Sequence, residues 1–221
     1  MSVHELSVGY GSTPVLDRVD LRLAAGSVLC VTGENGVGKS TLLRCVTGLI
    51  EPDGGTVMVF GERPDCSARY WRRVAATVEN PSWYSGLTVR EHVELVRLAN
   101  GADPADGRIE EVFAALGLTH LADSAPDSLS SGQRQRLLLS IVLARPSRLL
   151  VLDEPEQRLD TTVKDIVAEH LRAYAESGGS VLMASHDPIF IAAMGGEVLA
   201  LNRATAALTR AAGAPTGTGT A

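Results

Sequence analysis

The segment GENGVGKST, residues 33–41, contains the residue types that bind phosphate groups. It fits the pattern G-x-x-x-x-G-K-[ST], in which backbone N–H groups surround phosphates and the following helix adds its positive dipole. Glycine is needed where the backbone approaches the ligand closely at positive φ. In this pattern Lys39 reaches the β and γ phosphates and Ser40 binds Mg²⁺. The other predicted nucleotide-binding positions of the loop are Gly33, Asn35, Gly36, Gly38 and Thr41.

The alternative interpretation of this segment is a glycine-rich turn with an ordinary surface lysine. Lys39 is one of only two lysines in the chain, the other being Lys164. The apolar run SVLCVTG precedes the loop and the helical pattern STLLRCVTGL follows it. Because this strand–loop–helix context is the one that the pattern requires, we favour a phosphate-binding loop.

Asp153 and Glu154 form a second candidate group. They follow the apolar run LLVL, at the expected carboxyl end of a buried parallel strand, where open α/β sheets bind their ligands. A carboxylate there holds Mg²⁺ and the next one acts on the attacking water. The alternative is an acidic pair that ends a strand and caps the next helix.

Several elements must position these groups. Period-two alternation predicts antiparallel strands in VHELSV and VLDRVDLRL, separated by the turn GYGSTP. GTVMVFG, RLLVLDEP (148–155), SVLMASHD (180–187) and EVLALN are interpreted as further strands, with a helix over about 161–177. From Trp71 to about Ala144 the pattern is largely helical and includes the capping box Thr88-x-x-Glu91.

These elements predict an α/β fold: a phosphate-loop core with a mixed or parallel sheet, an antiparallel β edge and an inserted helical subdomain. We expect one domain over residues 1–203, with the helical subdomain at about 80–145. Residues 204–221 are almost all Ala, Thr, Gly and Pro and are predicted to be a disordered tail.

The composition limits the partners and the compartment. The net charge is −6 and the pI is near 5.4, so the chain lacks the basic surplus of a nucleic-acid binder and we expect no such partner. The three cysteines, Cys30, Cys45 and Cys66, are too few for a disulfide framework or a zinc site. The start has no signal-peptide pattern, and no apolar run reaches the roughly 18 residues that cross a bilayer, so we expect a cytosolic chain.

With these motifs in this order, the sequence resembles the nucleotide-binding subunit of an ATP-binding cassette (ABC) transporter over about residues 3–202. The string Leu129-Ser130-Ser131-Gly132-Gln133 is similar to the family signature LSGGQ, with Ser131 in place of the first glycine. Ser130 and the N–H groups at this helix start would form a second anion site. Taken alone, the string also fits a helix cap in which Ser130 pairs with Gln133.

The resemblance assigns roles to further residues. Tyr10 matches the aromatic residue on which adenine stacks, and its alternative is a turn tyrosine. His186 matches the switch histidine that contacts the γ phosphate, and otherwise it is a helix-capping or satisfied histidine. Asp160 matches the loop that crosses the dimer interface, and otherwise it is an N-cap.

One position departs from the family pattern. Eight residues before Leu87, where the family usually has a glutamine at the metal, this chain has Glu79. A carboxylate there could bind Mg²⁺ or orient water, but it brings another negative charge toward Glu154. The following stretch, with Trp83 and Tyr84, is then expected near the groove that receives a membrane partner, although core packing explains the aromatic pair equally well.

The resemblance implies an ATPase with Lys39, Glu154 and His186 as catalytic residues and with ATP and Mg²⁺ as cofactors. Two copies, or this chain and a homologue, would close head to tail around two ATP molecules. They would drive separate membrane-spanning permease subunits from the cytoplasmic face, as in a small exporter. The alternatives are a soluble ABC-type ATPase of repair, translation or cofactor assembly, and a weakly hydrolysing regulatory module.

Overall fold

Two β-sheets with helices around them form the core of the chain. A computed structural model describes all residues except 12, 79–81, 104, 203–207 and 211–221, and for residues 208–210 it describes the backbone. The smaller sheet is antiparallel, in the order β2-β1-β4, with β1 at Ser2–Tyr10, β2 at Thr13–Arg22 and β4 at Gly54–Met58. This sheet confirms the predicted antiparallel edge.

The larger sheet carries the strands that end at the candidate residues. Its order is β5-β6-β7-β3-β8-β9, parallel from β5 to β8, with β9 antiparallel to β8. The strands are β3 (Val28–Thr32), β5 (Val74–Ala76), β6 (Leu149–Asp153), β7 (Ser180–Ala184), β8 (Glu197–Leu201) and β9 (Leu208–Arg210). The sheet contains both strand directions, as the predicted mixed sheet requires.

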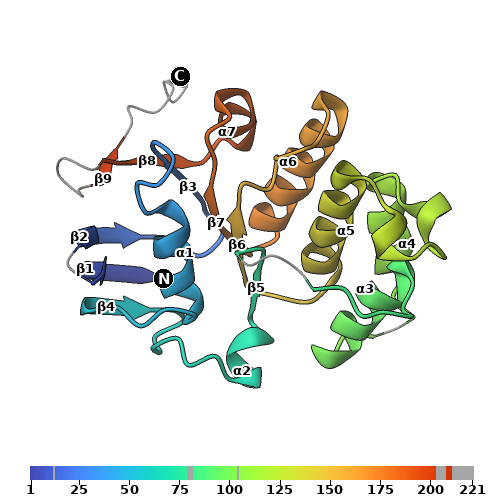
Figure 1. The fold of residues 1–221 in the computed structure, drawn as a ribbon, viewed down its shortest axis with the longest axis horizontal. Coiled ribbons are helices and arrows are strands. Elements are labelled where there is room, and N and C mark those ends of the chain that lie inside the picture. Colours follow the sequence, from blue (N-terminus) through green and yellow to red (C-terminus); the bar gives the residue numbers. More distant parts are fainter. Residues whose placement is uncertain (12, 79–81, 104, 203–207, 211–221) are drawn as a thin grey trace, which may run out of the picture.

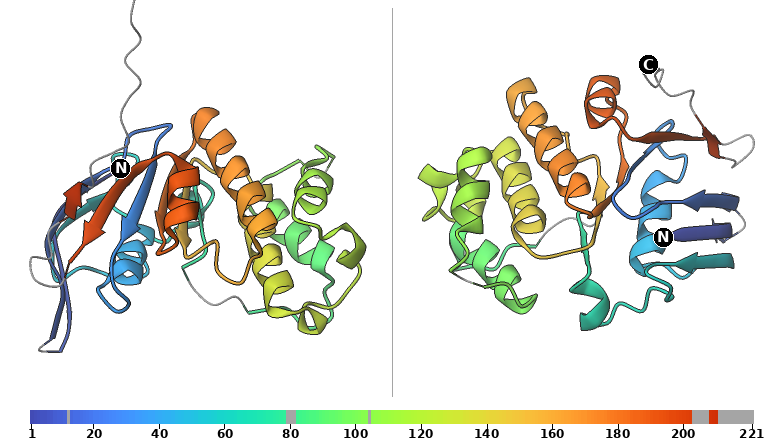
Figure 2. Two further views of the ribbon diagram at one scale, coloured as in Figure 1. Left: turned by 90° about the horizontal axis from the view of Figure 1, so that it is seen from above. Right: turned by 180° about the vertical axis from the view of Figure 1, so that it is seen from behind.

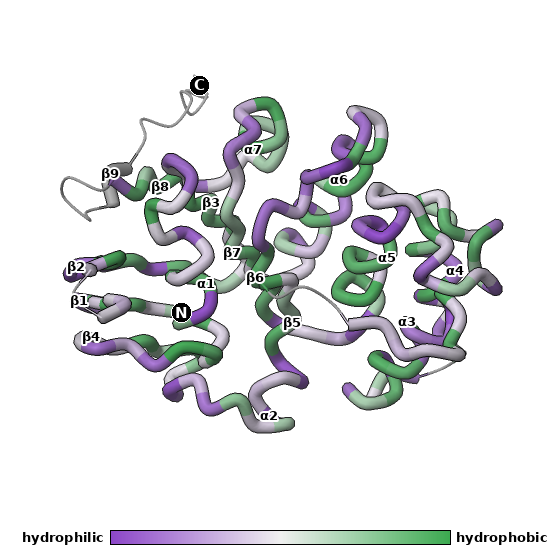
Figure 3. Tube along the Cα trace, viewed as in Figure 1, coloured by the Kyte–Doolittle hydropathy of each residue, from purple (hydrophilic) through white to green (hydrophobic). Residues whose placement is uncertain are grey.

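Successive residues of the central strands point into two different cores. In β6, Leu150 and Leu152 pack with the helices α3 to α6, while Leu149 and Val151 pack with α1 and the smaller sheet. All four side chains are essentially inaccessible to solvent. Burial of both faces explains why this strand has a continuous apolar sequence, which Figure 3 shows as green tube at the centre of the molecule.

The helices form two groups. α1 (Lys39–Thr47) contacts both sheets, and α6 (Thr161–Glu176) contacts β7 and α7 (Pro188–Met194). α3 (Val89–Ala99), α4 (Arg108–Ala115) and α5 (Ser131–Ala144) gather on the side of the molecule away from the smaller sheet (Figures 1 and 2). The short helices are α2 (Ala68–Trp71) and the 3₁₀ turns η1 (Thr119–Leu121) and η2 (Pro126–Ser128).

Two strands of the structure were not predicted from the sequence. The region from Trp71 to about Ala144 was expected to be largely helical, and β5 at Val74–Ala76 was not recognised in it, because this strand, which pairs with β6, is too short to show a strand period. The tail was expected to be disordered throughout, but residues 208–210 form β9 along β8. A ladder uses backbone N–H and C=O groups, so an edge strand can pair with a segment whose composition shows no strand pattern. The other positions of the predicted tail lie outside the described residues.

Among the described helices, none combines the length and the apolar character that a bilayer crossing needs.

Arg97 joins α3 to the end of α5, just before β6 begins. Its side chain is buried and donates hydrogen bonds to the carbonyl oxygens of Ala144 and Asp103, the second at 2.7 Å, and to Asp106 Oδ1 at 2.6 Å. These contacts satisfy carbonyl groups in the loop before α4 and at the last residue of α5.

Replacing Arg97 by Met should lower the free energy of unfolding by about 2–4 kcal/mol, because buried acceptors lose their donor. Chemical denaturation followed by circular dichroism measures the change. Arg69→Met is the matched control, since the Arg69 side chain is 74% exposed and pairs with Glu62 at the surface, where an ion pair contributes about 0–1 kcal/mol. Equal losses in the two variants would contradict a special role for the Arg97 contacts.

Candidate functional site

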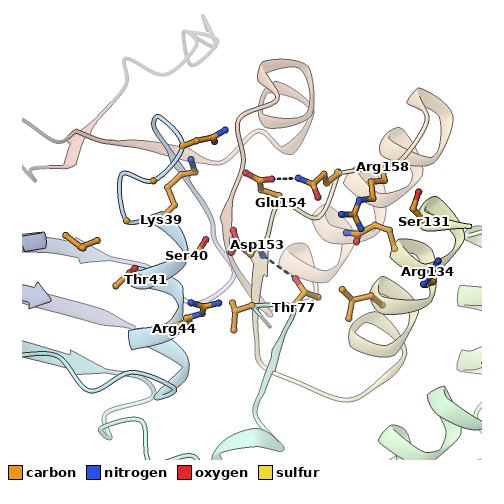
Figure 4. A pocket seen from close by; sticks show the side chains of 18 of the residues that line it. Lys39, Ser40, Thr41, Arg44, Thr77, Ser131, Arg134, Asp153, Glu154 and Arg158 are labelled. Carbon is orange, nitrogen blue, oxygen red and sulfur yellow. Dashed lines mark hydrogen bonds between the residues drawn. The ribbon is translucent and has the colours of Figure 1, made fainter. Parts of the chain in front are cut away.

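A cavity of about 1090 Å³ lies between the loop before α1 and the start of α5. Figure 4 shows Lys39 and Ser40 on one side, Asp153 and Glu154 in the middle, and Ser131 and Arg158 on the far side. The predicted residues that line it are Tyr10, Asn35, Gly36, Gly38, Lys39, Ser40, Thr41, Ser131, Asp153 and Glu154. Segments far apart in the sequence therefore meet at one concave surface.

The glycine loop has the backbone that its sequence predicts. Gly33, Gly36 and Gly38 have φ values of 146°, 74° and 110°. A Cβ atom at Gly33 would lie 2.5 Å from the carbonyl oxygen of Leu201, and one at Gly38 would lie 2.8 Å from Leu16 Cδ2. The positive φ values and the close neighbours of Gly33 and Gly38 exclude a side chain at these two positions. The loop backbone can therefore approach a ligand directly.

Lys39 is almost fully buried at the first position of α1. Its Nζ donates to the carbonyl oxygens of Gly33 at 2.7 Å and Glu34 at 3.1 Å, which holds the ammonium group across the loop. The N-cap is Gly38, which has no side chain to occupy the first N–H groups of the helix. The loop thus combines a cation and a helix N-terminus, a combination that suits phosphate groups.

Asp153 ends β6 opposite this loop. Burial raises the pKa of its carboxyl group, and a hydrogen bond donated by the Ser40 hydroxyl opposes the rise. The Asp153 backbone N–H donates to Thr77 Oγ1 at 3.2 Å. A carboxylate and a hydroxyl in contact supply the oxygen ligands that Mg²⁺ prefers, so Ser40 and Asp153 fit the predicted metal site.

Glu154 is held by two side chains and by its own backbone. His186 Nδ1 lies 3.2 Å from Glu154 Oε1, and Gln157 Nε2 donates to Glu154 Oε2 at 2.6 Å. Its backbone N–H donates to Ala184 O at 2.9 Å, and its φ is +47°, a conformation that non-glycine residues rarely adopt. The carboxylate is thus fixed at the cavity wall, where it can accept a proton from a bound water.

Other predicted residues lie outside the cavity lining. Ser130 caps α5 in a capping box with Gln133, and Asp160 caps α6 by accepting from the Val163 N–H at 3.0 Å. In the single chain, Ser130 and Asp160 are therefore helix caps, which is the structural alternative that the sequence analysis gave for each. Gly33, Gly132 and His186 also do not line the cavity, although His186 reaches it through Glu154. Glu79 lies outside the described residues, as does Asn80.

Sequence reasoning missed several residues of this cavity. Arg44, Thr77, Arg134, Gln157 and Arg158 line it. Thr77 was hidden because β5 was not recognised, whereas Gln157 and Arg158 followed the acidic motif and could have been considered with it.

An apolar groove of about 360 Å³ shares Trp83 with this cavity. Its lining is mainly apolar and includes Tyr84, 64% exposed, and Leu95, 42% exposed. Exposed apolar side chains in a concave surface are typical of a contact with another chain.

The family model described as "ABC transporter" matches residues 16–157. The chain belongs to the ABC transporter family. This agrees with the resemblance inferred from the motifs, and the matched range includes the phosphate loop, the signature-like string and the loop of Glu154.

Two ABC relatives and one solved cassette illustrate the family. The Fe(3+) ions import ATP-binding protein FbpC of Streptomyces avermitilis is 36% identical over 85% of this chain and 55% of its own length. The SkfA peptide export ATP-binding protein SkfE of Bacillus subtilis is 31% identical over 86% of this chain and 80% of its own length. A solved ATP-binding subunit of an ABC transporter is 26% identical, with a TM-score of 0.87 over 95% of this chain and 88% of that chain.

This chain therefore spans about half the length of FbpC and most of SkfE. Both relatives are ATP-binding subunits of the family. One is named for import and the other for export, so the comparison does not establish the direction of transport. The structural match confirms the predicted α/β cassette fold.

Gly38→Ala should weaken nucleotide binding at least tenfold, because the added Cβ displaces the loop from Leu16 and strains the backbone. Titration with a fluorescent ATP analogue measures the affinity. Gly107→Ala is the matched control: Gly107 is also a glycine N-cap at positive φ, but open space surrounds its Cβ position on α4. Unchanged affinity in Gly38→Ala would exclude this loop as the binding site.

Proposed function

We propose that this chain binds and hydrolyses ATP and thereby drives a membrane transporter. The observation that carries the proposal is the position of Glu154: its carboxylate is held by His186 and Gln157 in the cavity that also contains Lys39. A fixed base that shares a cavity with a phosphate-binding loop suits attack of water on a terminal phosphate.

Nucleotide binding rests on the loop and on Tyr10. The loop N–H groups and Lys39 bind the phosphates, and Tyr10, at the end of β1 and 55% exposed, provides a ring for adenine at the cavity margin. Ser40 and Asp153 hold Mg²⁺, with Glu79 as a further proposed ligand. When bound, the metal neutralises charge on the β and γ phosphates.

In the hydrolytic step, Glu154 accepts a proton from water while the water oxygen attacks the γ phosphorus and the bond to ADP breaks. His186 Nδ1–H donates to the Glu154 carboxylate and keeps it oriented. In such a reaction the protein contributes mainly by positioning the reacting groups and by placing charges that stabilise the transition state.

A second nucleotide-binding subunit completes the site. Ser130, Gly132 and Gln133 lie at the start of α5 and do not line the chain's own cavity, so we propose that they bind the nucleotide held by a partner cassette. Asp160, exposed at the start of α6, would lie at the same interface. ATP then joins the two subunits and hydrolysis separates them.

The membrane partner docks in the apolar groove beside Trp83 and Tyr84. A helix of a permease with an apolar face would bury these side chains, and we propose that it does so at the cytoplasmic face of the membrane.

Glu154→Gln should reduce ATP hydrolysis roughly 100-fold or more while ATP binding is retained, since the amide cannot accept the water proton. Phosphate release and binding of a fluorescent nucleotide are measured side by side. Glu169→Gln, an exposed change on α6, is the control. Hydrolysis at the wild-type rate in Glu154→Gln would remove this residue as the base.

Leu95→Asp should abolish stimulation of the ATPase by the membrane partner and leave basal hydrolysis unchanged, because a charge in the apolar groove opposes docking. The assay compares the tagged chain purified with its membrane partner and the same chain alone. Leu98→Asp, one turn along α3, is the matched control: Leu98 is 57% exposed and does not line the groove. Equal stimulation in both variants, or recovery of the chain only with soluble assemblies, would contradict this docking site.

A further inference from the structure

Glu156 has a buried carboxyl group that takes no part in the proposed hydrolysis. It lies on the loop between β6 and α6, two residues after Glu154, and is only 2% exposed. Within the described part of the chain, its Oε2 has no hydrogen-bond partner and its carboxyl group forms no ion pair. Carboxylates are seldom buried without a compensating partner, so this position requires an explanation.

A hydrogen bond from this side chain crosses to the neighbouring loop. Glu156 Oε1 accepts from the hydroxyl of Ser185, which is fully buried and immediately precedes His186. Ser185 is itself fixed, because its backbone N–H donates to Val31 O at 3.2 Å and its Oγ accepts from the Asp187 N–H at 3.2 Å. Glu156 therefore joins the loop after β6 to the turn Ser185–Asp187.

These two loops also carry the proposed catalytic pair. Glu154 and His186 meet at 3.2 Å on the cavity side, where the His186 side chain is 56% exposed. Glu156 and Ser185 meet on the interior side of the same two segments. The Glu154–His186 contact is exposed to water and by itself orders the imidazole ring only weakly. The Glu156–Ser185 hydrogen bond is buried, and in the low dielectric of the interior it is stronger and favours a single geometry.

The pKa of Glu156 responds both to its burial and to this contact. Burial raises the pKa of this carboxyl group, and the hydrogen bond from Ser185 opposes the rise. Both the acid and the carboxylate form of the side chain have an oxygen that accepts from Ser185, so the contact does not depend on the charge state.

We infer that Glu156 is a positioning residue, which ties the Ser185–Asp187 turn to the loop of Glu154 and so holds His186 on the Glu154 carboxylate. It acts through its hydrogen bond and its shape. The inference rests on the proposed roles of Glu154 and His186 in hydrolysis.

The test uses the full chain with Glu156→Gln, Glu156→Met, Ser185→Ala and the double variant Glu156→Met/Ser185→Ala. Gln keeps the size and an acceptor oxygen, whereas Met keeps only the size. We expect Glu156→Gln to retain kcat within about twofold and Glu156→Met to lose roughly tenfold in kcat at unchanged KM, because the nucleotide-binding loop is untouched. The double variant should lose no more kcat than Glu156→Met, since both substitutions remove the same Glu156–Ser185 hydrogen bond. Glu176→Met, at the exposed end of α6, is the control, and thermal unfolding checks that all variants fold.

A second measurement does not depend on turnover. In ¹⁵N-histidine NMR spectra of the chain, which has five histidines, Glu156→Met should shift the His186 ring resonances and leave those of the exposed His120 in place. Unchanged His186 resonances and an unchanged kcat in Glu156→Met would overturn the inference. Equal loss in Glu156→Gln and Glu156→Met would also overturn it, because the charge would then be what matters. If the wild-type chain hydrolyses no ATP, the proposed function fails, and the NMR result still decides whether Glu156 positions His186.

Discussion

The parallel pairing of β6 with β7 is the constraint on which the site depends. The two strands run in register from Leu149 beside Ser180 to Asp153 beside Ala184, so they end at the same level. The hydrogen bond from the Glu154 N–H to Ala184 O extends this pairing one residue beyond β6. Because both carboxyl ends meet at one edge, the residues that follow, Glu154 and His186, come within reach of each other.

The same edge explains why so many polar groups can be buried there. Lys39, Thr77, Ser185 and Glu156 are all buried, yet each has a hydrogen bond to a neighbouring loop or strand end. A polar group buried without a partner costs free energy, so the strand ends and loops must fit together as a set. The hydrogen bonds that hold the site also stabilise the fold, so a substitution in one of these loops should affect the position of the neighbouring loop.

The helix that follows the signature-like string is tied to this network. Gln135 on α5 donates to the carbonyl oxygen of Pro155 at 3.1 Å, and Arg136 lies 3.1 Å from Asp160 Oδ2. A Cβ atom at Gly132 would lie 2.8 Å from Arg158 O, so the start of α5 packs closely on the loop of Glu154. A partner that moves the helices α3 to α5 would therefore act on the loop that carries the proposed base, through contacts within one chain.

The sequence by itself determined the local chemistry. The phosphate loop, the acidic strand end and the capping box of Thr88 were predicted, and the capping box of Ser130 was recognised as an alternative, because each depends on residues within a few positions of one another. It could not reveal β5, whose three residues become a strand only through pairing with β6, or β9, which uses the free edge of β8. Nor could it show that Trp83 lines both grooves, or that Glu156 reaches Ser185, 29 positions away. Those contacts join segments distant in sequence, and only the packing of the sheet decides which distant segments meet.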